Sequence, residues 1–235
     1  MNSAKKQARV AGLLYLLASI IGCFGLIYIP GKLIVTGDAA ATATHIRASE
    51  TLFRLGIASE LIAFIMFIFV VLALYRLFKG VSEEHALAMA VLLLVSIPIS
   101  LLNVLNEIAA LILVSGADFL SAFEKGQLDA LAYLFLRLHG QGFVVAQIFW
   151  GLWLFPFGIL VIRSGFIPRV LGFLLFIAGF GYVASSFTSL LPYAPFVDRF
   201  ASVLTLGELP IIFWLLIWGA KDQLVNQPHA DPPVA

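Results

Sequence analysis

The stretch ALAMAVLLLVSIPISLLNVLNEIAALILV, residues 86–114, decides the fold of this chain. It exceeds the about 20 mostly apolar residues that a helix needs to cross a bilayer. Other apolar stretches of membrane-spanning length lie along the rest of the sequence. We therefore predict an all-α, polytopic membrane bundle whose six transmembrane helices cover residues 10–29, 52–78, 86–114, 139–162, 170–191 and 201–219.

The composition agrees with a protein that lies in lipid. Of 235 residues, 62% are hydrophobic and only 11% are charged, whereas a soluble domain carries about 25% charged residues. The lipid bilayer is therefore the first partner that we predict, and the predicted localisation is the cell membrane, crossed several times. Residues 1–221 are predicted to form a single membrane domain, and residues 222–235 a short disordered cytoplasmic tail.

Basic residues predict the orientation, because lysine and arginine accumulate on the cytoplasmic side of membrane proteins. With the N-terminus inside, eight basic residues fall on the cytoplasmic side and four on the other side, or six when Arg54 and Arg137 at the span edges are included. This distribution predicts that both termini are cytoplasmic. The cytoplasmic group is Lys5, Lys6, Arg9, Arg76, Lys79, Arg163, Arg169 and Lys221, and the opposite group is Lys32, Arg47, Lys125 and Arg199.

Several function classes lack their sequence signals. A formal charge of +1 without a basic arm argues against nucleic-acid binding. The single cysteine, Cys23, excludes an intrachain disulfide and a cysteine-cluster metal site. The sequence has no His-Glu-x-x-His zinc motif, no Gly-x-Ser-x-Gly nucleophile turn and no phosphate-binding glycine loop. We therefore favour a protein that is not an enzyme, and the sequence identifies neither a cofactor nor a metal.

Three acids lie inside the predicted spans, where an ionisable group is costly and usually functional. In the predicted topology, Glu60, Glu107 and Glu208 each lie about eight residues, or ~12 Å, below the outer surface. His139 and Gln141 enter the fourth span from the same side. This shared depth predicts a polar pocket that opens toward the outer face.

The third span carries the clearest polar pattern. Ser96, Ser100, Asn103 and Glu107 follow steps of four, three and four residues, so they share one face of a helix. Serine and asparagine often serve only as hydrogen-bonding groups between membrane helices, and we favour that interpretation for the stripe alone. The carboxylate at its end favours a functional site, because structural hydrogen bonding rarely requires an acid.

Glu208 and His139 each leave two interpretations open. Pro210 cannot donate to the carbonyl of Leu206, so a free acceptor beside Glu208 is expected to help it hold a cation or a proton. The alternative is a neutral Glu208 bonded to a neighbouring helix. His139 is either a proton relay or ligand, or simply a hydrogen-bonded histidine near a helix end. A metal site drawn from these acids and His139 has no specific support from their spacing.

Arg54 and Arg137 are the candidate ion partners of the buried acids. Arg54 precedes Glu60 by six residues and lies on another face of the same helix, so any such pair must form between helices. Extension of the arginine toward the nearby interface is the simpler interpretation. Before the second span, Gly37-Asp38 and an Ala/Thr run predict a short helix that Asp38 caps.

Four stretches together resemble a known family: 49–56 (SETLFRLG), 136–139 (LRLH), 163–172 (RSGFIPRVLG) and 207–209 (GEL). They are similar to a prokaryotic six-helix integral membrane family, catalogued as domain of unknown function four-three-eight-six. The resemblance covers nearly the whole chain except the tail. It implies six spans and supplies no activity, so it transfers no functional residue.

Two main hypotheses of function follow from these observations. The first is small-solute or proton-linked transport, or ligand sensing, through a pocket formed by Glu60, Asn103, Glu107, His139, Gln141 and Glu208. The second is a non-catalytic membrane partner or assembly subunit whose buried acids are structural. An intramembrane enzyme comes third. A homo-oligomer would suit a transporter of this small size, although no residue pattern specifies one.

Overall fold

The computed structural model describes residues 3–189 and 195–220. Within these residues, six helical segments are long and apolar enough to cross a membrane, which confirms the predicted all-α, six-span bundle. The segments are Ala4–Leu33, Glu50–Phe78, Glu83–Ser115, Lys125–Ser164, Arg169–Thr188 and Phe200–Ile217. The predicted tail at 222–235 lies outside the described residues.

Several segments consist of more than one helix. The first is α1 (Ser3–Cys23), the π-helix η1 (Phe24–Tyr28) and α2 (Ile29–Leu33) in direct succession. The short α3 (Ala39–Ala48) precedes the unbroken α4 (Glu50–Phe78) and α5 (Glu83–Ser115). The later elements are η2 (Asp118–Leu120), α6 (Lys125–Leu152), α7 (Leu154–Ser164), α8 (Arg169–Thr188), α9 (Pro195–Leu204), the 3-10 helix η3 (Thr205–Glu208) and α10 (Leu209–Ile217).

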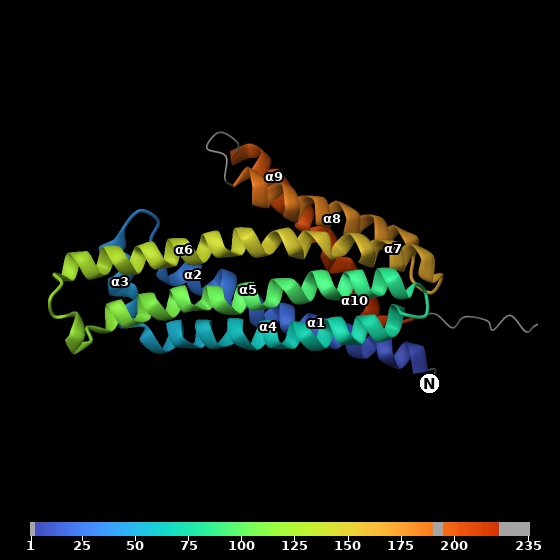
Figure 1. Cartoon of the computed structure of the whole chain (residues 1–235), viewed down its shortest axis with the longest axis horizontal. Helices are drawn as coiled ribbons and strands as arrows, with labels where there is room; N and C mark the ends of the chain where they lie inside the picture. The colour runs from blue at the N-terminus through green and yellow to red at the C-terminus, as the bar shows by residue number, and fades with distance from the viewer. Residues whose placement is uncertain (1–2, 190–194, 221–235) are drawn as a thin grey trace, which may run out of the picture.

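The long helices α4, α5 and α6 lie side by side, and α3 stands across one end of them, which we call the α3 end (Figure 1). Helix α1 packs on α4 and α10, while α8 packs on α6 and α7. The N-terminus lies at the opposite end of the bundle (Figure 1). There Arg9 donates a hydrogen bond to the carbonyl of Ile217 at 2.9 Å, so the first and last spans meet. The cytoplasmic location of both termini remains a prediction.

Two local predictions have different outcomes. Asp38 caps α3 by accepting a hydrogen bond from the backbone of Ala41, which confirms the predicted short helix. The expected start of the fourth helix at 139 is wrong, because α6 already begins at Lys125. Glu124 and Gln127 form a capping box there, and this reciprocal pair satisfies backbone groups at the helix start. Residues 125–138, which precede the predicted span, therefore belong to the same helix.

An ion-pair network that the sequence did not reveal fastens α3 to the bundle. Arg47 on α3 pairs with Asp129 on α6 and donates from Nε to the carbonyl of Val114 at the end of α5. Lys125 Nζ lies 2.7 Å from the other Asp129 carboxylate oxygen, and only 3% of the Asp129 side chain is exposed. The i,i+4 spacing of Lys125 and Asp129 was the available sequence signal.

Replacing Asp129 with asparagine is expected to lower the free energy of unfolding by about 2 kcal/mol, because the variant leaves Arg47 without its buried charged partner. The measurement is denaturant or thermal unfolding of the full chain in detergent. Lys125→Ala is the control, and its expected effect is below about 0.5 kcal/mol because that side chain is 70% exposed. Equal losses in the two variants would contradict the structural role of the Arg47–Asp129 pair.

Candidate cation-binding site

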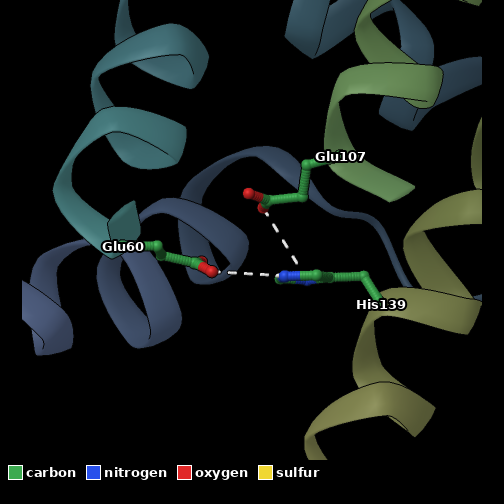
Figure 2. Close-up of side chains that lie close together, drawn as sticks. All are labelled: Glu60, Glu107 and His139. Atoms are coloured by element: carbon green, nitrogen blue, oxygen red, sulfur yellow. Dashed lines mark hydrogen bonds and ion pairs between the residues drawn. The ribbon is translucent and has the colours of Figure 1, made fainter. Parts of the chain in front are cut away.

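Three ionisable side chains from three helices point toward one another inside the bundle (Figure 2). Glu60 extends from α4, Glu107 from α5 and His139 from α6. His139 Nε2 lies 3.2 Å from Glu60 Oε2, and His139 Nδ1 lies 3.8 Å from Glu107 Oε1. One donor atom from each residue lies within 4.8 Å of the others. We call Glu60, Glu107 and His139 the Glu–His–Glu cluster.

The cluster is buried and its hydrogen bonding is incomplete. The exposed fractions of Glu60, Glu107 and His139 are 0%, 3% and 6%. Within the described residues, Glu60 Oε1 and Glu107 Oε2 have no hydrogen-bond partner, and neither does the hydroxyl of Ser100 on the same face of α5. Buried polar atoms are normally paired. Each acid of the cluster therefore keeps one buried carboxyl oxygen without a hydrogen-bond partner in the described part of the chain.

The first span presses closely against Glu60. A Cβ atom on Gly25 would lie 2.6 Å from Glu60 Cγ and 2.8 Å from the backbone oxygen of Gly56, so only glycine fits there. Gly25 lies in η1, and short π-helical turns within α-helices are frequent at functional sites. Phe64 follows Glu60 by one helical turn and so lies on the same face of α4. The close approach of Gly25 therefore leaves the Glu60 side chain little room beside η1.

The polar stripe of α5 contacts α6 at the backbone of His139. Asn103 Nδ2 donates a hydrogen bond of 2.8 Å to the backbone carbonyl of His139. Gly142, on α6, permits this contact, because a Cβ atom there would lie only 1.9 Å from Asn103 Oδ1. The ring of His139 also meets Phe143 edge-on, with 4.7 Å between ring centroids. Asn103 thus positions the helix that carries the cluster's only imidazole.

Glu208 is not part of the cluster. It ends η3 and accepts a hydrogen bond from the hydroxyl of Tyr15 on α1. Both residues line a separate cavity of about 290 Å³. The free carbonyl expected beside Glu208 is also absent from this part of the described chain, because the Leu206 oxygen accepts the backbone N–H of Leu209. The 3-10 turn before Pro210 supplies this bond, so the prediction of an unpaired acceptor is wrong.

The remaining predicted site residues lie outside the cluster. Gln141 is exposed, because it is two residues beyond His139 and so points to another side of α6. Arg54 is exposed and pairs with Glu50, one turn earlier on α4, with 2.7 Å between Nη2 and Oε1. Arg137 is likewise exposed on α6. The structure brings together Glu60, Asn103, Glu107 and His139 from the predicted set.

The cluster combines donor types that suit a divalent transition metal. One imidazole and two carboxylates are ligands found in zinc and other first-row metal sites. A tetrahedral ion with bonds of about 2.0–2.2 Å holds its ligands roughly 3.4 Å apart. One donor atom of each residue lies within 4.8 Å of the others, so the three side chains must move closer together to reach that geometry.

Comparisons with known proteins complete this description. A family model described as Domain of unknown function (DUF4386) matches residues 10–219. An uncharacterized protein of Archaeoglobus fulgidus is 36% identical over 85 residues, which are 36% of this chain and 51% of the archaeal protein. The chain therefore matches about half the length of that relative. No solved structure matches the chain.

Proposed function

This chain belongs to the DUF4386 family, whose description names no activity, and we propose that it binds a small cation inside the membrane for proton-linked transport or sensing. The proposed site is the Glu–His–Glu cluster, and the proposed ligand is a divalent transition-metal ion that exchanges with protons. One observation carries the proposal: three buried donor groups from separate helices converge on one place.

The charge of the cluster supports a cation as ligand. Two ionised carboxylates at this separation repel each other strongly in a medium of low dielectric constant. A protonated His139 would still leave one negative charge without compensation. A divalent ion bound to both carboxylates and a neutral imidazole brings the net charge to zero. Because protons supply this neutrality in the metal-free protein, metal uptake is expected to release protons.

The donor set favours zinc, manganese or ferrous iron over calcium or magnesium. Calcium and magnesium prefer sites made of oxygen ligands alone, whereas an imidazole nitrogen suits first-row transition metals. The cluster supplies three protein donors and so leaves a coordination position for water or for a bidentate carboxylate. The unpaired Glu60 Oε1 and Glu107 Oε2 are available for that second mode.

Access to the cluster would require movement at the α3 end. Ile46 on α3, Phe53 on α4 and Leu111 on α5 belong to the buried core at that end. They cover the side from which we predict that an external ion arrives. Transport therefore requires α3 to move away from the bundle, against the Arg47–Asp129 pair, whereas sensing requires only that the ion enters and stabilises the closed form.

Titration of the full chain in lipid nanodiscs with zinc or manganese, after removal of any histidine tag, tests the proposal. We expect one ion to bind per chain and the weakly buffered solution to become more acidic as it binds. Absence of saturable binding up to about 1 mM metal, which corresponds to only ~4 kcal/mol of binding free energy, would refute cation binding at this cluster.

A structural role of the acids is the second candidate, and one observation favours it. His139 reaches Glu60 on α4 and Glu107 on α5, and its carbonyl is bonded to Asn103, so it joins three helices. In this case the chain would be a non-catalytic partner or assembly subunit. Unfolding of the metal-free Glu60→Gln variant separates the two candidates.

A further inference from the structure

The cavity beside Glu208 lies apart from the Glu–His–Glu cluster and opens on the side of the helix bundle, not at one of its ends. Its volume is about 290 Å³, and it lies among α1, η1, α4, α5, α6, α8, η3 and α10. Phe64 and Trp150 line it, and the rings of both pack in tilted arrangements against Phe143, whose ring contacts His139. An aromatic layer therefore separates the cavity from the cluster, and the two sites are distinct.

The opening of the cavity faces the predicted hydrocarbon region. Ile27 in η1, Leu206 in η3 and Leu209 in α10 line the cavity and are also 68%, 58% and 45% exposed. Exposed apolar residues within membrane spans contact lipid. Both walls of the opening depart from the regular α-helix, since η1 is a π-helix and η3 a 3-10 helix. Such departures are frequent at functional sites.

The lining combines aromatic surface with one acid. Trp150, Trp153 and Tyr182 supply large rings, and Glu208 and Tyr15 supply the bonded polar pair. Among the described residues that line the cavity there is no lysine, arginine or histidine. An anionic head group would therefore meet a carboxyl group without a balancing cation. A cationic head group would find both a carboxylate acceptor and aromatic faces that attract positive charge.

We propose that this cavity binds an amphiphilic amine, which enters from the bilayer between η1 and η3. Its ammonium group donates to the carboxyl group of Glu208, and its apolar body fills the space between the aromatic rings. The volume is at the lower end for small-molecule sites, which span about 300–1,000 Å³, so a single alkyl chain or one ring system fits. This binding is independent of cation binding at the Glu–His–Glu cluster.

The wild-type chain carries its own reporter for this test. Cys23 lines the cavity, is exposed, and is the only cysteine of the sequence. In nanodiscs, dodecylamine is expected to slow alkylation of Cys23 by N-ethylmaleimide, with an apparent affinity about tenfold higher than that of dodecanol, the value of one charge-assisted hydrogen bond. Dodecanol and dodecanoic acid, at equal mole fractions in the membrane, are expected to slow it much less. Equal protection by all three compounds, or protection by none, would overturn the proposal.

Two variants identify where the amine binds. Glu208→Gln is expected to reduce protection by dodecylamine to the level of dodecanol, and unchanged protection would overturn the assignment of Glu208. In the double variant Cys23→Ala/Leu17→Cys, the thiol moves to a lipid-facing position of α1 that is 41% exposed and does not line the cavity. Dodecylamine should leave the alkylation rate of this thiol unchanged. A similar slowing there would mean that the amine acts on the membrane and would overturn the proposal.

Discussion

Replacing Glu60 with glutamine is expected to weaken binding of zinc or manganese by about a hundredfold or more. Removal of groups that merely orient a metal ligand already costs 10–100-fold in affinity, and Glu60 is one of only three protein donors in the cluster. The neutral amide also leaves the bound ion with an excess positive charge. The measurement is a competition titration of the full chain in nanodiscs with a metal-binding dye.

Glu50→Gln is the matched control for this prediction. Glu50 starts the same helix, its side chain is 43% exposed, and it pairs with Arg54. Its loss is expected to leave metal affinity unchanged, because surface ion pairs contribute little. Equal effects of the two substitutions would show that the lost affinity reflects the overall charge of the protein and would contradict binding at the cluster.

The stability of the metal-free Glu60 variant distinguishes a binding site from structural hydrogen bonding. If the acids form a cation-binding site, Glu60→Gln removes a buried charge or an unpaired carboxyl oxygen from the metal-free protein. The free energy of unfolding of the metal-free variant should then equal or exceed that of the wild type. If the acids are structural, the substitution weakens the contact with His139 and stability should fall by about 1–3 kcal/mol. The measurement is unfolding in detergent with a metal chelator present.

Replacing Gly142 with alanine is expected to lower the free energy of unfolding by about 3 kcal/mol. The new Cβ would lie 1.9 Å from Asn103 Oδ1 and 2.3 Å from Asn103 Cγ, so the asparagine must move. Its hydrogen bond to the His139 carbonyl would then be lost in a buried place, where an unsatisfied group costs about 1–3 kcal/mol in addition to the steric strain. Unfolding in detergent measures the loss.

Gly140 provides the control within the same turn of α6. A Cβ atom on Gly140 meets nothing within 4 Å, so Gly140→Ala is expected to stabilise the helix by about 0.5–1 kcal/mol through its better helix propensity. The two glycine variants should therefore shift stability in opposite directions. A similar small change in both would mean that α5 and α6 are not packed around Asn103 as described.

Hydropathy was sufficient to predict the bundle, because six long apolar segments leave few alternatives in a bilayer. Depth was also informative for the site: Glu60 and Glu107 were predicted at one level and His139 was predicted to enter from the same side, and the three are close neighbours in the structure. The predicted depth of an acid in the membrane did not specify which helices surround it. Glu208 shares the predicted depth, yet α10 packs on α1, so Glu208 contacts Tyr15 and not the other acids.

The details that the sequence did not reveal depend on contacts between distant segments. No local sequence feature indicates that Tyr15, in an apolar helix, has a hydrogen-bond partner. That partner, Glu208, lies 193 residues away along the chain. The role of Gly142 depends on which helix faces it, since Gly140 and Gly142 look alike in the Leu-His-Gly-Gln-Gly run. The π-helix at Phe24–Tyr28 was not predicted either, although Pro30, which cannot donate a backbone hydrogen bond, follows it closely.

A zinc K-edge X-ray absorption spectrum of the full chain, loaded with one equivalent of zinc after removal of any tag, tests the central claim most directly. Cation binding by the Glu–His–Glu cluster predicts nitrogen and oxygen ligands at about 2.0–2.2 Å with imidazole scattering. That scattering should disappear in His139→Gln and persist in His45→Gln, a change on α3 outside the cluster. Zinc with only oxygen ligands, or imidazole scattering that survives the loss of His139, would contradict the account.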